Sequence, residues 1–191
     1  ERTTIYTFDE TADTLTRRAE ATNTMVKQMI DAGALSIVDI EALRYGPDEF
    51  ANMVRSDVES AGTRLVMIDS VSGYRLSVSG TELQTRIHAL CRYLKNVGIT
   101  TLLVNELQDL NEFRISDTNI SYLCDNVIYM RYVEQEVERY AQLGRALGIL
   151  KKRLSDFDKG LYEFQITSQG FRVGQRLPTF AGLLAPVRLP A

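Results

Sequence analysis

Short apolar runs alternate with amphipathic segments along the first hundred residues. Four runs rich in β-branched and aliphatic residues predict strands; they are 3–8, 35–39, 65–69 and 100–105. Between them, apolar residues recur every three or four positions, which predicts helices; these are 11–23, a helix opening at Pro47, and 81–96. Strands separated by helices of this length predict an α/β fold with a mostly parallel sheet flanked by helices.

The pattern changes after residue 106. Residues 109–119 are polar and predict a loop, and three β-rich runs follow it; they are 127–133, 145–152 and 162–167. We expect these runs to form an antiparallel meander at the edge of the parallel sheet, as a C-terminal β extension. Residues 178–191 contain three prolines and predict an extended arm, so the expected division is a domain at 1–177 and an arm at 178–191.

The composition is that of an ordinary globular domain. The chain has 191 residues, of which 45% are hydrophobic and 25% charged. A net charge of −3 argues against a nucleic-acid partner, and one histidine with two cysteines gives few ligands for structural zinc. Without an apolar run of about 18 residues or a signal-peptide pattern, we expect no membrane partner and a cytoplasmic location.

Asp69 ends the apolar run 65–69. P-loop ATPases hold the magnesium of their nucleotide with a carboxylate at such a strand end. An aspartate that caps the following loop gives the same pattern, which leaves both interpretations open. The phosphate-binding motif G-x-x-x-x-G-K-[ST], which usually accompanies a magnesium site of this kind, is absent from the sequence.

Asp9 and Glu10 follow the first predicted strand. Carboxylates at this edge of an open α/β sheet could take a proton from an attacking water. Taken alone, the pair is better explained as the start of a helix, where acidic residues are common.

Lys151, Lys152 and Arg153 end the run 145–152 and precede an acidic turn. Because side chains at i and i+2 of a strand point the same way, Lys151 and Arg153 could reach one phosphate together. A basic cluster that keeps an exposed strand edge solvated is the alternative.

Several segments, in this order, resemble the KaiC-like branch of the RecA-type ATPases. They are IYTFDE (5–10), RLVMIDSVSGYRLS (64–77), LKNVGITTLLVNE (94–106), ISYLCDNVIYMRYVE (120–134), RALGILKKRLSDFDKG (145–160) and GFRVGQRLPTFAGLL (170–184). The resemblance implies a RecA-like sheet. In that family the first strand and the P-loop lie just upstream of the strand at 3–8, so this sequence is expected to be a RecA-like domain with those parts missing.

The resemblance also implies roles for individual residues. Asp9 and Glu10 would position water and, with Asp69, help hold Mg²⁺. A second group would touch ATP bound to the adjacent subunit of a homo-oligomeric ring, a hexamer in this family; it comprises Arg145, Lys151, Lys152, Arg153 and Ser155. Ser121 falls where a phosphorylated hydroxyl is found. Three departures from the family pattern are Asp9 in place of Glu, Leu154 before Ser155 in place of Gly, and Tyr122 in place of Thr.

The expected function is therefore that of a KaiC-type ATPase or autokinase subunit. It would hydrolyse ATP at inter-subunit sites, with Mg²⁺, in signalling or circadian-type timing and with signalling proteins as partners. By themselves, these 191 residues are expected to be inactive, since they lack the phosphate cradle. The alternatives are a degenerate, non-catalytic module for oligomerisation and partner binding and, ranked last, a DNA-handling protein.

Overall fold

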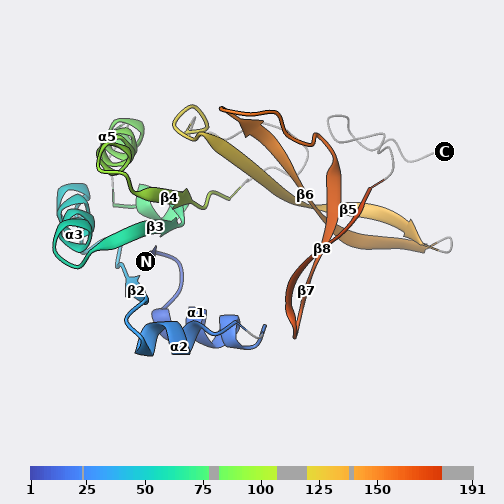
Figure 1. The fold of residues 1–191 in the computed structure, drawn as a ribbon, viewed down its shortest axis with the longest axis horizontal. Coiled ribbons are helices and arrows are strands. Elements are labelled where there is room, and N and C mark those ends of the chain that lie inside the picture. Colours follow the sequence, from blue (N-terminus) through green and yellow to red (C-terminus); the bar gives the residue numbers. More distant parts are fainter. Residues whose placement is uncertain (23, 78–81, 107–119, 138–139, 178–191) are drawn as a thin grey trace. The chain divides into compact units, whose positions relative to one another are not determined.

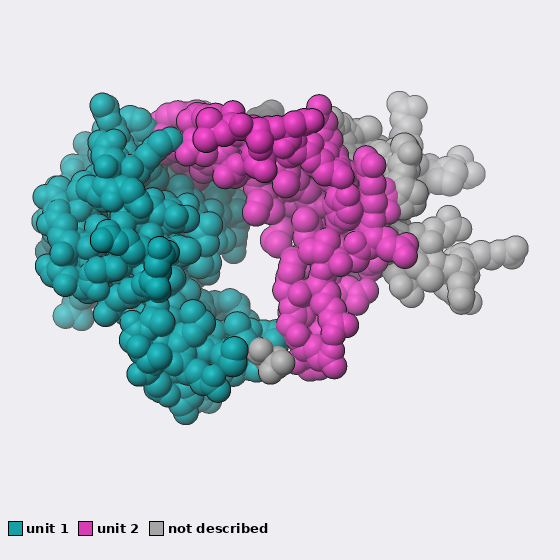
Figure 2. All heavy atoms as spheres, in the orientation of Figure 1, with its two compact units in different colours: residues 1–108 teal, residues 109–191 magenta. Residues whose placement is uncertain are grey.

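The computed structural model describes residues 1–22, 24–77, 82–106, 120–137 and 140–177. The chain divides into two compact units, Glu1–Gln108 and Asp109–Ala191, coloured teal and magenta in Figure 2. The first unit contains a parallel four-stranded sheet and the second an antiparallel four-stranded sheet.

The parallel sheet has the strand order β2-β1-β3-β4. Its strands are β1 (Arg2–Thr7), β2 (Leu35–Asp39), β3 (Thr63–Asp69) and β4 (Thr100–Leu103). Because all four run in the same direction, their carboxyl ends meet at one edge of the sheet. This edge receives the segments that follow β1, β3 and β4.

Helices cover both faces of this sheet. They are α1 (Ala12–Glu20), α2 (Val26–Asp31), α3 (Pro47–Glu59), α4 (Val71–Arg75) and α5 (Leu83–Asn96). In Figure 1, α3 and α5 lie on one face, and α1 and α2 lie toward the other. Two helix starts follow directly from the sequence: Thr11 Oγ1 accepts from Thr14 N and caps α1, whereas Pro47 opens α3.

An aromatic cluster joins β1 to α3 and α4 in the core. Phe50 of α3 is fully buried. The centre of its ring lies 5.3 Å from the ring centres of Tyr6 and Phe8 and 5.2 Å from that of Tyr74. Tyr6 also donates to Asp57 Oδ2 at 2.5 Å, which pairs its buried hydroxyl. The cluster fixes the end of β1, directly before Asp9.

The antiparallel sheet has the order β5-β6-β7-β8. Its strands are β5 (Asn126–Val137), β6 (Tyr140–Lys152), β7 (Leu161–Thr167) and β8 (Gly170–Arg176). Tyr129 and Val133 of β5 are buried, whereas Ile128, Met130 and Tyr132, which alternate with them, are 67%, 51% and 49% exposed. One face of β5 therefore presents a row of apolar side chains to solvent.

The structure differs from the sequence interpretation at the first helix and in the meander. The helix predicted over 11–23 ends at Glu20, and an unpredicted helix, α2, follows it. The predicted meander has a fourth strand, β8, and its strands pair with one another in a separate sheet, not with the edge of the parallel sheet, over the described residues. The loop predicted at 109–119 and the arm at 178–191 lie outside the described residues, so the division at residue 177 stays a prediction.

Candidate active site at the carboxyl edge of the parallel sheet

Parallel pairing brings the predicted acidic residues to one edge. Thr7 of β1 pairs with Asp69 of β3, and Phe8 N donates to Asp69 O at 2.8 Å. Asp9 and Glu10 follow immediately, so they lie at the end of β3 as well as of β1. Glu106, after β4, adds a fourth carboxylate whose charge acts on Asp69.

Asp9 is held by the turn that follows β3. Ser70 Oγ donates to Asp9 Oδ2 at 2.6 Å and accepts from Gly73 N at 3.0 Å. Gly73 lies so close that a Cβ there would come within 2.4 Å of Phe8 Cβ and 3.0 Å of Asp9 Oδ1. The absence of a side chain at Gly73 therefore makes room for the Asp9 carboxylate.

Glu10 is fixed by β1 and by α1. Thr7 Oγ1 donates to Glu10 O at 2.8 Å and accepts from Glu10 N at 3.4 Å. Arg18 donates to Glu10 Oε1 at 2.5 Å in an ion pair. The backbone of Glu10 is thus anchored to the strand end, while its carboxylate reaches a cation two turns along the helix.

The pKa of the Asp69 carboxyl is raised by its surroundings. Burial raises its pKa above the ordinary value, and the carboxylates of Glu10, Asp9 and Glu106 raise it further, against an opposing effect of Arg18. Crowded carboxylates of this kind suit a divalent cation, which would relieve their repulsion.

The carboxylate oxygens at this edge suit a Mg²⁺ ion whose remaining ligands come from water and a nucleotide. Over the described part of the chain, no three His, Cys, Asp or Glu side chains are arranged to hold a metal ion by themselves. Mg²⁺ is usually bound by one or two carboxylates together with water and substrate phosphates. Asp69 and Asp9 offer such carboxylates, so the donor set is compatible with magnesium carried by a nucleotide.

In the second unit, two of the predicted cations hold a single turn. Lys151 Nζ donates to Ser121 O at 2.9 Å, while Arg153 donates to Asp125 Oδ1 at 2.9 Å and to Tyr122 O at 3.1 Å. Both side chains therefore reach the segment 121–125, a contact that the sequence analysis did not predict. In this structure they bind that turn.

The remaining predicted residues of this unit are placed differently. Lys152 and Ser155 are exposed. Arg145 pairs with Tyr132 in the β5–β6 register, and its guanidinium lies 5.6 Å from the centre of the Tyr132 ring. Whether any of these residues meets a nucleotide stays a prediction.

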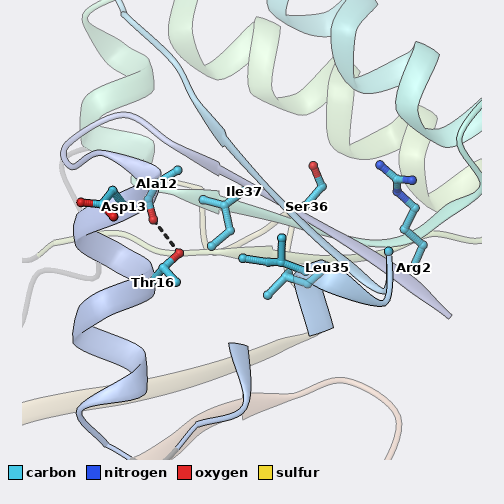
Figure 3. Close-up of a pocket in the computed structure, with 9 residues that line it drawn as sticks. Arg2, Ala12, Asp13, Thr16, Leu35, Ser36 and Ile37 are labelled. Carbon is cyan, nitrogen blue, oxygen red and sulfur yellow. Dashed lines mark hydrogen bonds between the residues drawn. The ribbon is translucent and has the colours of Figure 1, made fainter. Parts of the chain in front are cut away.

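A cavity of about 460 Å³ lies elsewhere in the first unit. Its lining comes from β1, β2, α1, α2 and the turn after α2, and includes Arg2, Thr16 and Ile37, with Thr16 donating to the carbonyl of Ala12 (Figure 3). None of the predicted site residues lines it. The acidic edge is therefore the better candidate site, because it gathers the groups that can perform chemistry.

Three further residues belong to the site but were not among the sequence predictions. Ser70 follows Asp69 and is 2% exposed, Arg18 lies on α1, and Glu106 follows β4. The sequence does contain a signal for two of them. A serine directly after a strand is a common helix cap, which indicates Ser70, and Glu106 is an acidic residue directly after a predicted strand, as Asp9 is. The hydrogen bond from Ser70 to Asp9 joins residues 61 positions apart, so no local pattern indicates it.

A family model described as ATPase: KaiC matches residues 1–177. The chain belongs to the KaiC ATPase family. Its RecA-like α/β fold with a C-terminal β extension, predicted from the sequence, agrees with the two sheets.

Curated members of the KaiC family align along nearly the whole chain. The circadian clock protein KaiC3 of Synechocystis sp. is 27% identical over 97% of this chain, and the circadian clock oscillator protein KaiC of Synechococcus elongatus is 26% identical over 99%. The KaiC of Thermostichus vulcanus is 24% identical over 99%. The chain spans 36% of the length of each of these three relatives.

Among the helices that the structure describes, none has both the length and the apolar character needed to cross a bilayer.

Proposed function

We propose that this chain forms part of an ATPase that hydrolyses ATP at sites between the subunits of a ring. The observation that carries the proposal is the convergence of Asp9, Glu10 and Asp69 at one sheet edge, in a chain of the KaiC ATPase family. Burial and neighbouring carboxylates disfavour the charge on Asp69, which is the condition that a bound cation relieves.

Each acidic residue has a distinct role in this reaction. Glu10 would position the attacking water and accept its proton, and Asp69 and Asp9 would hold Mg²⁺. Mg²⁺ bound with ATP supplies neutralising charge for the transferred phosphoryl group. Arg18 holds the Glu10 carboxylate in the structure, so it must release or share that carboxylate during turnover.

The cations of the second unit complete the site of a neighbouring copy. Lys151 and Arg153 hold the 121–125 turn, which leaves exposed Lys152 and Ser155, with Arg145, as the groups that can approach a nucleotide bound to another subunit. A cation supplied by the neighbour stabilises charge on the phosphoryl group, so hydrolysis depends on assembly.

The apolar row of Ile128, Met130 and Tyr132 supports the proposed homo-oligomer. Contiguous exposed apolar side chains mark surfaces that bind other proteins. The row shares its strand pair with Arg145, which lies opposite Tyr132. A neighbour close enough to meet Arg145 would therefore also cover part of this row.

The biological output that we propose is cytoplasmic signalling or circadian-type timing through protein partners. The relatives named as circadian clock proteins support a timing role. Ser121 is the candidate for autophosphorylation; its carbonyl is held by Lys151, which places a positive charge beside this residue.

A second candidate is a non-catalytic RecA-like module that serves oligomerisation and partner binding. The sequence favours it in one respect, because these 191 residues contain no G-x-x-x-x-G-K-[ST] phosphate cradle. Under this alternative the apolar row keeps its role, and the acidic edge has lost its substrate.

ATP hydrolysis by the natural protein that contains this chain separates the two candidates. We expect Mg²⁺-dependent turnover by an assembled particle and a fall of about 100-fold or more with Glu10→Gln, which removes the proton acceptor. The matched control is Glu20→Gln at the exposed end of α1, which should keep the wild-type rate. An assembled particle without turnover in any variant would instead favour the non-catalytic module.

A further inference from the structure

The Ser70 hydroxyl makes two hydrogen bonds that fix its orientation. Its oxygen accepts from Gly73 N at 3.0 Å, and its single proton points to Asp9 Oδ2 at 2.6 Å. The second distance lies at the short end of the range for O–H···O hydrogen bonds. Ser70 is 2% exposed, so water has little access to its hydroxyl.

We propose that Ser70 is a positioning residue that holds the Asp9 carboxylate in one orientation within the acidic cluster and affects the reaction only through Asp9. This inference rests on the proposed ATP hydrolysis. Its structural basis is a hydrogen bond between the segments that follow β1 and β3, which carry two of the carboxylates.

The surroundings of Asp9 show why such a contact matters. Asp9 is exposed, and an exposed side chain samples several rotamers unless a partner selects one. Gly73, next to the same carboxylate, leaves space that a Cβ would fill at 3.0 Å from Asp9 Oδ1 and 3.1 Å from Asp9 Oδ2. Ser70 thus supplies the directional contact, and Gly73 supplies the room for the orientation that this contact selects.

Ser70 also has a structural role, which the experiment must separate from the proposed one. Its side chain caps α4 through Gly73 N, so Ser70→Ala removes a helix cap as well as the bond to Asp9. A loss of activity in that variant alone would not identify the cause. The effect of Ser70→Ala must therefore be compared with and without the Asp9 carboxylate.

A double-mutant cycle on the natural full-length protein makes this comparison. The variants are Ser70→Ala, Asp9→Ala and the double variant, with Ser70→Thr to restore the hydroxyl and Ser72→Ala as a control in the same helix. For each protein, kcat and KM for ATP are measured, together with the affinity for Mn²⁺ alone, which reports on the acidic cluster without turnover.

We expect Ser70→Ala to lower kcat or Mn²⁺ affinity by roughly 10- to 100-fold, with KM for ATP changed by less than about twofold. Ser70→Thr should recover most of the loss, and Ser72→Ala should behave as wild type. In the Asp9→Ala background, adding Ser70→Ala should change either quantity by less than about twofold, because the partner is gone.

Equal losses with and without Asp9 would overturn the inference, since they would show that Ser70 acts through the fold of α4. Wild-type kcat and Mn²⁺ affinity in Ser70→Ala would overturn it too, while the proposed function stands if Glu10→Gln is inactive. If wild type binds Mn²⁺ but hydrolyses nothing, the proposed function fails and the Mn²⁺ cycle decides the role of Ser70. Wild type that neither binds Mn²⁺ nor hydrolyses ATP contradicts both.

Discussion

At the scale of single residues, the carboxylates at the acidic edge repel one another, and neighbouring side chains hold two of them in place. The repulsion felt by Asp69 is unfavourable for folding, whereas the bonds from Ser70 to Asp9 and from Arg18 to Glu10 hold the neighbouring carboxylates. Functional sites often store unfavourable charge in this way, because the same charge later binds a ligand. The charge and the close packing of this edge can each be tested by substitution.

The first prediction concerns the pH dependence of stability. Burial, and then Glu10 and Asp9, raise the pKa of Asp69 above its ordinary value of 3.8, so the folded state binds this proton more readily than the unfolded chain. Above the raised pKa, the ionised group lowers the free energy of unfolding. Asp69→Asn should therefore stabilise the protein near pH 7.

The gain in the free energy of unfolding from Asp69→Asn should shrink as the pH falls through the raised pKa. Asp69 then becomes neutral in the folded state, as the asparagine is at every pH. Urea denaturation of both proteins from about pH 7 to about pH 4 measures this difference. A gain that is constant over that range would show that ionisation of Asp69 is not its source.

The second prediction concerns the close approach at Gly73. Gly73→Ala places a Cβ 2.4 Å from Phe8 Cβ, so the β1 end and α4 must separate. We expect a loss of about 1–3 kcal/mol in the free energy of unfolding. Gly174→Ala is the control, since its Cβ would meet its nearest neighbour at an ordinary 3.5 Å; equal stability of the two variants in urea would refute the packing argument.

At the scale of elements, the sequence predicts those whose pattern is local. Residues 65–69 form a strand because their apolar run is unbroken, and α3 starts at Pro47 as its proline predicts. The short α2 was not predicted, because its first residue, Val26, follows Met25, which makes no side-chain cap. The convergence of Asp9 with Asp69 follows from parallel pairing, whereas the bond from Ser70 depends on tertiary contacts that no spacing encodes.

The packing of α3 on the sheet gives the third prediction. Phe50 is fully buried among Tyr6, Phe8 and Tyr74, so Phe50→Ala removes three aromatic contacts and leaves a cavity. We expect the free energy of unfolding to fall by about 3–5 kcal/mol. The control is Leu43→Ala, at a side chain 92% exposed, which should change it by less than about 0.5 kcal/mol in the same urea titration.

The exposed row on β5 gives the fourth prediction. Met130 lies between Ile128 and Tyr132 in that row, and a lysine in its place would put a charge into the proposed interface. Met130→Lys should shift the protein toward smaller species in sedimentation velocity. Leu43→Lys, which also replaces an exposed apolar side chain with a charged one but in the first unit, should not. Unchanged assembly in Met130→Lys would exclude this row from the interface.

At the scale of the whole molecule, the two units carry complementary chemistry. The first unit gathers carboxylates at a sheet edge, and the second presents Arg145, Lys152 and Ser155. Membership of the KaiC ATPase family connects these features with nucleotide hydrolysis. The central proposal is that one ATP site draws its acidic residues from one copy and its cations from the next.

Mixing two inactive proteins tests that proposal most directly. One is the full-length protein with Glu10→Gln, and the other carries Arg145→Ala with Lys152→Ala. If the site is shared between copies, an equimolar, re-assembled mixture should recover about a quarter of the wild-type rate, because each interface draws its two sides independently. A mixture as inactive as its components, or a cation variant that is fully active alone, would contradict it.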